Sequence, residues 1–538
     1  TRIIFTARDT KMSVCNVDSK DDSTQRVRDP PDAHTSSTRN LLDETMVEPI
    51  QERDISMLHM IGYGIGHFYN DLCASMWFTY LMIFFEKVLN FRSSLAGALM
   101  LIGQVTDAIS TPCVGMASDG SLMPLFLLRF GRRISWHAIG TLCVSVSFAF
   151  IFNQCFACGS GTSEGWRVVW FVPFIMLFQF GWASVQISHL ALIPELSGDK
   201  RCRSMMGSIR YSFTVMANLG VFCILAVFLN SGEQSGAISS NDLVHFRTAA
   251  FMVIGVGLFT SMIFYATTRE PHSARRMSRL NSFSSEASGI MRMSWRNWLR
   301  HFQFYEIAIL YMLSRLYINV SQVYFPFYIT LGQNYAKGYV AILPIVSYTS
   351  SFIVSSMISA PSVAALLNRK ALYLAGCLCG LGNCVWMLFE LHSGFIYVVA
   401  ALLGIAQAIL LVTSLAITAD LINKNTESGA FVYGVMSFLD KLANGFAYQG
   451  IQLLTPKCDI NSTNGACALF YRNVMVFVPG GCLVLALLVI ISLIPQKIGK
   501  RSGGRSHIQH YDEEDLSDSE IVENGDEGPS NSIGGRLI

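Results

Sequence analysis

The sequence is poor in charged residues. Asp, Glu, Lys and Arg make up only 14% of its 538 residues, whereas soluble domains carry roughly a quarter. Hydrophobic residues make up 51%, and the mean hydropathy is +0.41. The formal net charge of +2 is too small to indicate a nucleic-acid partner. The shortage of charge therefore argues against a soluble domain and indicates a membrane protein.

Several sequence signals are also missing. No secretory signal precedes the first apolar block, so we expect the polar head, residues 1–57, to stay in the cytosol. The chain opens on Thr1 rather than Met, and we expect its true start to lie upstream. There is no HExxH motif and no catalytic pair, which argues against an intramembrane enzyme. No second ligand pair accompanies Cys155 and Cys158 to form a zinc site, so we expect neither a metal nor a cofactor.

Long apolar blocks occupy the middle of the chain. A transmembrane helix needs about 20 apolar residues. Blocks of this kind lie near residues 58–85, 94–117, 134–153, 168–194, 207–229, 248–267, 304–331, 338–362, 371–390, 394–422, 429–454 and 474–495. They fall into two sets of six. The sequence therefore predicts an all-α membrane protein with twelve transmembrane helices in two six-helix bundles.

The composition divides the chain into five parts. A polar N-terminal tail (1–57) precedes the first bundle (58–268), and a polar C-terminal tail (497–538) follows the second bundle (304–496). The linker between the bundles, 269–303, is rich in serine and carries seven arginines, at positions 269, 275, 276, 279, 292, 296 and 300. We expect both tails to be disordered and the linker to be basic and flexible.

Basic residues indicate the orientation. They follow the even-numbered spans, at Arg129, Arg132, Arg133, Lys200, Arg201, Arg203, Arg369, Lys370, Lys424, Lys497, Lys500 and Arg501. The opposite loops are poorer in basic residues. The positive-inside rule then predicts that both termini and the linker lie in the cytosol.

The loop between the last two spans carries signs of a non-cytosolic location. Asn461 begins a glycosylation sequon there, and Cys458 and Cys467 flank it. Cys155 and Cys158 share the loop after the third span, which the same orientation places on the non-cytosolic side. In an oxidising compartment these cysteines are candidates for disulfide bonds.

Ionisable residues within the spans are the main candidates for function, because a charge at the bilayer centre costs roughly 2.5–3.5 kcal/mol on insertion scales. The candidates for binding a substrate or coupling ion are Asn70, Asp71, Asp107, Thr111, Gln186, Arg315, Asp440 and Lys441. Asp440 and Lys441 are adjacent, so on a helix their side chains point about 100° apart. We therefore expect Lys441 to meet an acid of the other bundle, either Asp71 or Asp107. A purely structural ion pair between the bundles is the alternative.

Three further charges, Glu195, Arg210 and Asp420, lie near the cytosolic ends of their spans. They fit either side chains that reach the membrane surface or salt bridges of a gate. His67 and His189 fit hydrogen-bonded histidines of a helix core better than binding residues.

At this stage the residues resemble a known family. The second span and its loop contain Asp107, Pro112, Gly115, Asp119, Arg129, Gly131, Arg132 and Arg133. Asp71 precedes them in the first span, and Glu195, Arg210, Asp420 and Lys441 follow in order at the expected spans. This pattern resembles the glycoside-pentoside-hexuronide cation symporters, the melibiose-carrier group of the major facilitator superfamily. The resemblance covers about residues 58–495 and implies the major facilitator fold. It also implies that Gly115, Asp119, Arg129, Gly131, Arg132 and Arg133 form a cytosolic gate motif that latches the two bundles.

Other stretches, 66–68, 70–80, 178–184, 412–416, 428–434 and 437–441, resemble one subgroup of the superfamily more closely. That resemblance implies a protein of lysosome and melanosome membranes that imports cysteine and affects pigment. Composition and spacing by themselves say nothing of cysteine.

The sequence departs from the sodium–sugar symporters of the group. Asp107 matches one of their cation-binding acids, but Thr111 and Gln186 stand where two others are expected. Sodium prefers several oxygen ligands with carboxylates among them. The departure favours a proton-coupled or uncoupled mechanism and argues against a sugar as substrate.

The remaining charges suit a zwitterion such as an amino acid. Asp71 or Asp107 is a candidate for its ammonium group, and Lys441 or Arg315 for its carboxylate. An unpaired Asp71 or Asp107 is also a candidate proton carrier, since burial favours the neutral acid. We therefore expect a monomeric secondary transporter in the lipid bilayer that moves a small polar solute, with cysteine implied by resemblance. A lipid or lysolipid transporter, a sugar–cation symporter and a non-transporting receptor or scaffold are the alternatives.

Overall fold

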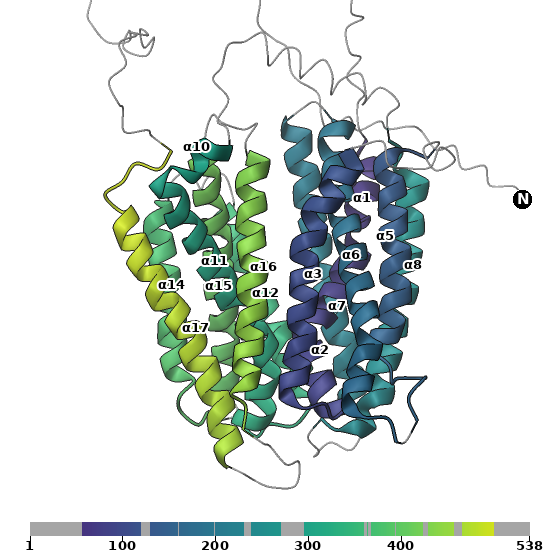
Figure 1. The fold of residues 1–538 in the computed structure, drawn as a ribbon. Coiled ribbons are helices and arrows are strands. Elements are labelled where there is room, and N and C mark those ends of the chain that lie inside the picture. The colour runs from purple at the N-terminus through teal and green to yellow at the C-terminus, as the bar shows by residue number, and fades with distance from the viewer. Residues whose placement is uncertain are drawn as a thin grey trace, which may run out of the picture. The chain divides into compact units, whose positions relative to one another are not determined.

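The computed structural model describes residues 56–119, 130–159, 161–197, 200–230, 238–270, 295–359, 363, 367–392, 394–422, 429–456 and 465–499. Every regular element in these ranges is a helix. The helices form two bundles that stand side by side, with the first half of the chain in purple to teal and the second in green to yellow (Figure 1).

The first bundle contains α1 (Met57–Ile65), α2 (Phe68–Ile83) with the π-helical turn η2 (Phe84–Val88), α3 (Ser93–Asp119), α5 (Arg132–Ile151), α6 (Glu164–Leu196), α7 (Lys200–Asn230), the short η3 (Ser240–Asp242) and α8 (Leu243–Thr267). The first span, expected as one helix, is broken between α1 and α2 at Gly66 and His67. Counting α1 and α2 as one unit, this half supplies six transmembrane units within the described residues.

The second bundle contains the short α10 (Trp295–Leu299), α11 (Phe302–Phe327) with the π-helical turn η4 (Tyr328–Gly332), α12 (Tyr339–Ser359), α14 (Arg369–Trp386), α15 (Phe395–Ile422), α16 (Gly429–Leu453) and α17 (Gly465–Leu493). Here the six long helices correspond to the six expected spans. We call the end where α8 finishes and α11 begins the linker end, and the opposite end the far end.

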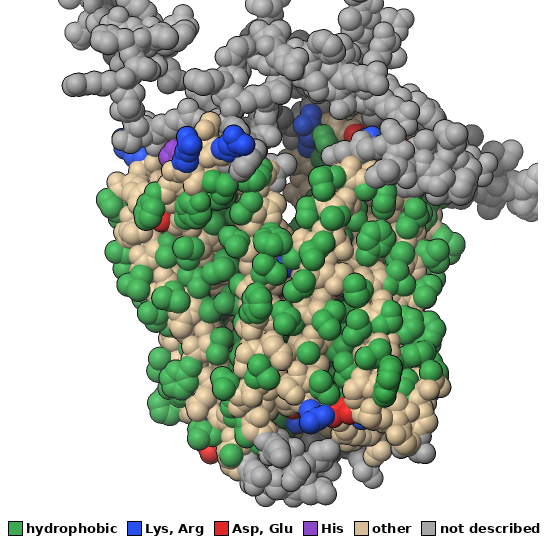
Figure 2. Space-filling model, viewed as in Figure 1, with side chains coloured by type: hydrophobic (Ala, Val, Ile, Leu, Met, Phe, Trp, Pro, Cys, Tyr) green, Lys and Arg blue, Asp and Glu red, His purple; other side chains and the backbone are tan. Residues whose placement is uncertain are grey.

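Seven of the described helices are long and apolar enough to span a membrane by length and composition alone: α5, α6, α7, α8 together with η3, α12, α15 and α17. The other units include α3, α11 and α16, which carry the charged residues Asp107, Arg315 and Lys441 inside the molecule. The outer surface between the two ends is densely covered by hydrophobic side chains, and most of the visible charges gather at the ends (Figure 2). This distribution suits a protein surrounded by lipid.

Among the described helices, the most extensive contacts between the bundles are those of α3 with α16, α7 with α12, and α2 with α11. In Figure 1, α3 and α16 run next to each other at the centre of the molecule. Each of these six helices therefore has a face that packs against the other bundle.

Buried polar contacts tie the bundles together at the far end. Lys337 Nζ lies 2.9 Å from Asp242 Oδ1, and both side chains are at least nine-tenths buried. The buried Glu86 carboxylate accepts hydrogen bonds from Tyr471 and Gln452 at 2.9 and 3.2 Å. Glu86 and Asp242 belong to the first bundle and their partners to the second, so these contacts close the far end of the interface.

Candidate functional site

A cavity of about 290 Å³ lies between the two bundles, near the middle of the helices that line it. Polar residues from both bundles face it, among them Asp71, Thr214, Asn218, Arg315, Asn319 and Gln322. Asp71 comes from the first bundle and Arg315 from the second. The cavity therefore exposes one carboxylate and one guanidinium group from opposite sides of the interface.

Asp71 lies in the first turn of α2 and is 7% exposed. The Thr214 hydroxyl donates a hydrogen bond to Asp71 Oδ2 at 2.7 Å, and His67 Nδ1 lies 2.9 Å from the same oxygen. The amide N–H groups at a helix N-terminus also stabilise negative charge. The broken first helix thus creates a site for an anionic side chain in the middle of the bundle.

Two other histidines contact the break itself. His137 Nε2 lies 3.0 Å from the Gly66 carbonyl oxygen, and His189 Nε2 lies 2.8 Å from the Tyr63 carbonyl oxygen. Both side chains are fully buried. These carbonyls lie next to the interruption of the backbone hydrogen-bond ladder, so the imidazoles supply donors at a helix end. The expectation of hydrogen-bonded core histidines describes His189 well, whereas His67 pairs with Asp71 beside the cavity.

Arg315 lies at the middle of α11 and pairs with Asp440 of α16. Arg315 Nε donates to Asp440 Oδ2 at 3.1 Å, and Asn444 Nδ2 donates to Asp440 Oδ1 at 2.6 Å. The bond to Asp440 uses only Nε. The terminal nitrogens of Arg315 can therefore form a forked pair of bonds with a carboxylate that enters the cavity.

Lys441 turns away from Asp440 and toward the first bundle. Its Nζ lies 2.7 Å from Asp107 Oδ1 and donates to Thr111 Oγ1 at 2.6 Å. The Thr111 hydroxyl donates to the same Asp107 oxygen at 3.1 Å. Of the two acids expected from helical geometry, Asp107 is therefore the partner of Lys441. This ion pair joins α3 to α16 and does not line the 290 Å³ cavity.

Two other expected binding residues also lie away from the cavity. Asn70 is 1% exposed, and its Nδ2 lies 3.4 Å from His67 Nε2. Gln186 accepts a hydrogen bond from Trp182 Nε1 at 2.9 Å within α6. The structure thus brings Asp71 and Arg315 to the cavity, and it leaves Asn70 and Gln186 inside the first bundle.

Several described contacts of the loop motif after α3 lie within the first bundle. Gly131 adopts φ +101° at the start of α5, a conformation that favours glycine, and a Cβ there would lie 2.5 Å from Glu270 Oε2. Arg133 Nε lies 3.1 Å from Glu195 Oε1, and Arg133 Nη1 donates to the Ser118 hydroxyl at 2.6 Å. All of these partners belong to the same bundle. Arg129 lies outside the described residues, and the latch between bundles stays a prediction.

The other boundary charges differ in their surroundings. Asp420 pairs with Arg369 inside the second bundle, and both side chains are exposed. Arg210 has a buried Nε without a hydrogen-bond partner among the described residues. At the far end, Cys155 and Cys158 form a disulfide bond. Cys467 lies in α17, but Cys458 and Asn461 lie outside the described residues, so their pairing and glycosylation stay predictions.

Sequence reasoning missed the neutral polar residues of the cavity. Asn218, Gln322, Tyr348 and Gln407 line it, and each occurs within a long apolar span. The amide side chains of Asn218, Gln322 and Gln407 were the available signal, because an amide within an apolar span needs hydrogen-bond partners inside the protein. Among the described residues, no group of three or more His, Cys, Asp or Glu side chains is placed to hold a metal ion.

Comparisons with known proteins agree with this architecture. Residues 62–498 match the family model described as MFS/sugar transport protein. Major facilitator superfamily domain-containing protein 12 of Homo sapiens is 41% identical over 457 residues, which cover 82% of this chain and 94% of the human protein. The Mus musculus protein of the same name is 40% identical over 459 residues, covering 83% and 95%. The solved structure of a D-xylose-proton symporter has a TM-score of 0.59 at 16% identity and covers 82% of this chain and 98% of its own. The chain therefore belongs to the major facilitator superfamily domain-containing protein 12 family of the MFS/sugar transport proteins, and it is a twelve-helix secondary transporter rather than an enzyme.

Proposed function

We propose that this transporter moves a small zwitterionic solute, most specifically the amino acid cysteine, through the 290 Å³ cavity by alternating access. The single observation that carries the proposal is the placement of Asp71 and Arg315 on opposite sides of that cavity. A zwitterion needs an anion beside its ammonium group and a cation beside its carboxylate. The choice of cysteine rests on the family resemblance of residues 66–80, 178–184 and 428–434.

In the proposed complex, the two ends of the solute contact different bundles. The carboxylate of the solute accepts hydrogen bonds from the terminal nitrogens of Arg315. The bond from Arg315 Nε to Asp440 holds the guanidinium group in position. The ammonium group donates to Asp71, whose side chain is fixed by Thr214. Neutral amides of Asn218, Asn319 and Gln322 complete a polar lining. A bound zwitterion then bridges the bundles, which is how a substrate influences their relative movement.

The Asp107 pair argues against sodium coupling. Lys441 Nζ contacts both Asp107 and Thr111, so an ammonium group already neutralises the one carboxylate that matches the cation site of the group. A sodium ion would have to displace a covalently tethered cation. We therefore favour proton coupling or an uncoupled mechanism, with Asp71 as the candidate proton carrier because it faces the cavity.

The lipid alternative fits the cavity less well. Drug-sized ligands occupy pockets of roughly 300–1,000 Å³. At about 290 Å³ this cavity lies just below that range, and ten of its lining residues have polar side chains: Asp71, Tyr211, Thr214, Asn218, Arg315, Asn319, Gln322, Tyr348, Ser351 and Gln407. An acyl chain would need a longer apolar space. A small polar solute is therefore the better match.

We further propose that the linker end faces the cytosol and that the protein resides in lysosome and melanosome membranes. The orientation rests on the basic residues that follow the even-numbered spans. The disulfide between Cys155 and Cys158 at the far end suits an oxidising lumen. With the far end closed, the described state would receive its solute from the cytosol, as import into the organelle requires.

Uptake into proteoliposomes tests the proposal. The purified protein is reconstituted, and the uptake of labelled cysteine, cystine, xylose and lysophosphatidylcholine is measured while pH and sodium are varied independently. We expect saturable uptake of cysteine that does not depend on sodium. Uptake of xylose or the lysolipid in preference to cysteine would contradict the proposal.

Two variants test the roles proposed for Asp71 and Arg315 in the cavity. Removing one charge-assisted hydrogen bond costs roughly 1.5–3 kcal/mol, so Asp71→Asn and Arg315→Gln should each lower the kcat/KM for cysteine at least about tenfold. The control is Arg92→Gln, which removes a surface ion pair with Glu164 at the far end, away from the cavity. Cysteine uptake by both cavity variants at the rate of the control would contradict the assigned roles.

A further inference from the structure

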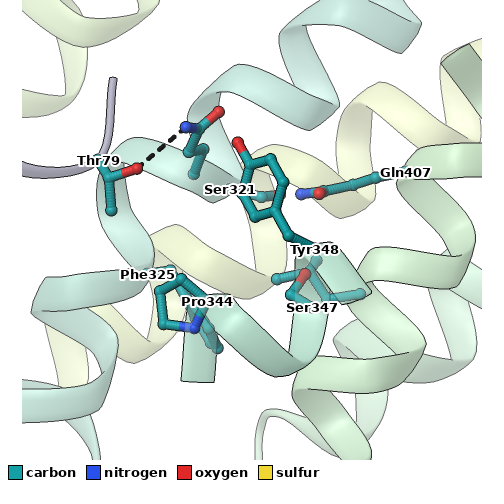
Figure 3. A pocket seen from close by; sticks show the side chains of 9 residues that line it. Thr79, Ser321, Phe325, Pro344, Ser347, Tyr348 and Gln407 are labelled. Carbon is teal, nitrogen blue, oxygen red and sulfur yellow. Dashed lines mark hydrogen bonds between the residues drawn. The ribbon is translucent and has the colours of Figure 1, made fainter. Parts of the chain in front are cut away.

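A small side cavity opens next to the main one, on its far-end side. It measures about 20 Å³ and shares Gln322, Tyr348 and Gln407 with the lining of the larger cavity. Its other walls include Ser321, Phe325 and Leu403, the first two on α11 and the third on α15. Figure 3 shows Tyr348 and Gln407 turned toward each other beside Ser321, with Phe325 and Pro344 on the opposite side.

The side cavity contains a polar group without a partner. The Ser321 side chain is fully buried, and its hydroxyl has no hydrogen-bond partner among the described residues. Leaving a buried hydroxyl unpaired is unfavourable. The neighbouring Thr79 hydroxyl, in contrast, already accepts a hydrogen bond from Gln322 Nε2 at 3.0 Å (Figure 3). Ser321 is thus the hydroxyl that a group entering the side cavity can engage.

The size of the side cavity restricts what can enter. A cavity needs roughly 10–15 Å³ on this measure to hold one water molecule, so 20 Å³ accepts one group of about that size. A thiol, a hydroxyl or a methyl group meets this limit, whereas a thioether chain or an aromatic ring does not. Phe325, Pro344 and Leu403 make most of the wall apolar, which suits a thiol because it is polarisable and only weakly polar.

We propose that this side cavity is the specificity pocket for the side chain of the transported amino acid. The inference rests on the proposed function, in which Arg315 and Asp71 hold the charged groups of the solute in the main cavity. The side chain then enters between Tyr348 and Gln407, and a terminal thiol or hydroxyl hydrogen-bonds to Ser321. The pocket admits small side chains and rejects longer ones, and Ser321 distinguishes cysteine and serine from alanine.

Competition experiments on three variants test the pocket. Uptake of labelled cysteine is measured against unlabelled glycine, alanine, serine and methionine, and binding of each amino acid is also followed as a ligand-induced rise in the melting temperature. Leu403→Ala enlarges the pocket, so methionine should compete at least about tenfold better than with the wild type. Leu415→Ala is the matched control, because it makes the same change on α15 at a residue that lines neither cavity.

Ser321 is varied in two ways. Ser321→Ala removes only the hydroxyl, so KM for cysteine and serine should rise about three- to tenfold while the apparent affinity for alanine stays unchanged. Ser321→Val also fills the space, so cysteine and serine should lose competition and thermal stabilisation while glycine keeps both. Melting temperatures without ligand verify that each variant is folded.

The outcomes separate this inference from the proposed function. If the wild type transports cysteine but Leu403→Ala and both Ser321 variants leave the order of competing amino acids unchanged, the pocket is overturned and the proposed function stands. If the wild type transports no amino acid, both are overturned. A changed order in the expected direction, absent from Leu415→Ala, supports the pocket.

Discussion

Two buried ion pairs neutralise four of the charged side chains inside this transporter. Asp107 pairs with Lys441, and Asp440 pairs with Arg315, with three of the four side chains at most 13% exposed. Removing one member of a buried pair leaves an unpaired charge and is far more harmful than removing both. Because Asp440 and Lys441 are neighbours, the two pairs form one chain of charges from the first bundle to the cavity.

Variants that neutralise Asp107 or Lys441 test the cost of an unpaired buried charge. Asp107→Asn or Lys441→Gln alone should destabilise the protein by about 3–5 kcal/mol, whereas the double variant should recover most of that loss. The measurement is thermal unfolding in detergent, with cysteine uptake recorded in parallel. The control pair, Asp420→Asn and Arg369→Gln, is exposed and should change stability by about 1 kcal/mol or less.

Uptake by these variants separates structure from mechanism. Full recovery of both stability and uptake in the double variant would make the Asp107 pair purely structural. Recovery of stability with slow uptake would assign it to the transport cycle, which is the result we expect because the pair joins the two bundles. Single variants as stable as the wild type would contradict the argument from unpaired charge.

The buried histidines give a second prediction at this scale. His137 contacts the Gly66 carbonyl through Nε2 at 3.0 Å and the Tyr265 hydroxyl through Nδ1 at 2.8 Å. His137→Phe keeps a ring of similar shape but leaves a buried acceptor unpaired, so we expect a loss of about 1–3 kcal/mol and a lower melting temperature. The same change at the exposed His392 should leave the melting temperature as it is. An unshifted melting temperature for His137→Phe would refute its role at the helix break.

At the scale of elements, the first long helical unit of each bundle ends in the same way. The π-helical turns η2 and η4 are each followed two residues later by an asparagine with positive φ, Asn90 at 55° and Asn334 at 56°. The hydrogen bonds from Leu89 to Phe84 and from Gln333 to Tyr328 also correspond. The correspondence indicates an internal structural repeat between the bundles.

The close packing of α12 against α15 at Gly404 gives a second prediction about the helices. α12 and α15 approach so closely that a Cβ on Gly404 would overlap the Ser347 backbone carbonyl oxygen. Gly404→Ala must therefore push the two helices apart, and we expect a loss of about 1–3 kcal/mol or more from overpacking, seen as a lower melting temperature. Gly382→Ala in α14 is the control, since nothing lies within 4 Å of its Cβ position. Equal melting temperatures for the two variants would contradict the close approach.

For the whole molecule, the decisive feature is the closed far end. Lys337→Gln leaves Asp242 buried without its partner and should loosen the contact between the bundles there. Hydrogen–deuterium exchange followed by mass spectrometry should then show at least about tenfold faster exchange at residues 238–242 and 333–339, which corresponds to about 1.4 kcal/mol of lost local stability. Arg92→Gln removes an ion pair within the first bundle and should leave these segments unchanged. Identical exchange in both variants would mean that the Lys337 pair does not hold this end closed.

The sequence predicted the fold better than the site. Length and hydropathy located all twelve units, although they missed the break at Gly66 and His67, because both fragments of the helix are apolar and no proline marks the interruption. Helical geometry also predicted that Lys441 meets an acid of the other bundle. It did not decide between Asp71 and Asp107. Asn70 and Gln186, which the sequence made candidates for binding, do not line the 290 Å³ cavity.

What the sequence alone determined is the set of spans, their division into two bundles and the kinds of charge that the interior contains. These are local properties, since apolar length and residue type can be read without knowing any contact. Only the tertiary structure decided which groups meet. Thr111 and Lys441 are 330 positions apart, and Asp71 shares a cavity with Arg315 although they belong to different bundles. The packing of α3 on α16 and of α2 on α11 brings these residues together. The sequence pattern of one helix does not contain the position of the helix that packs against it.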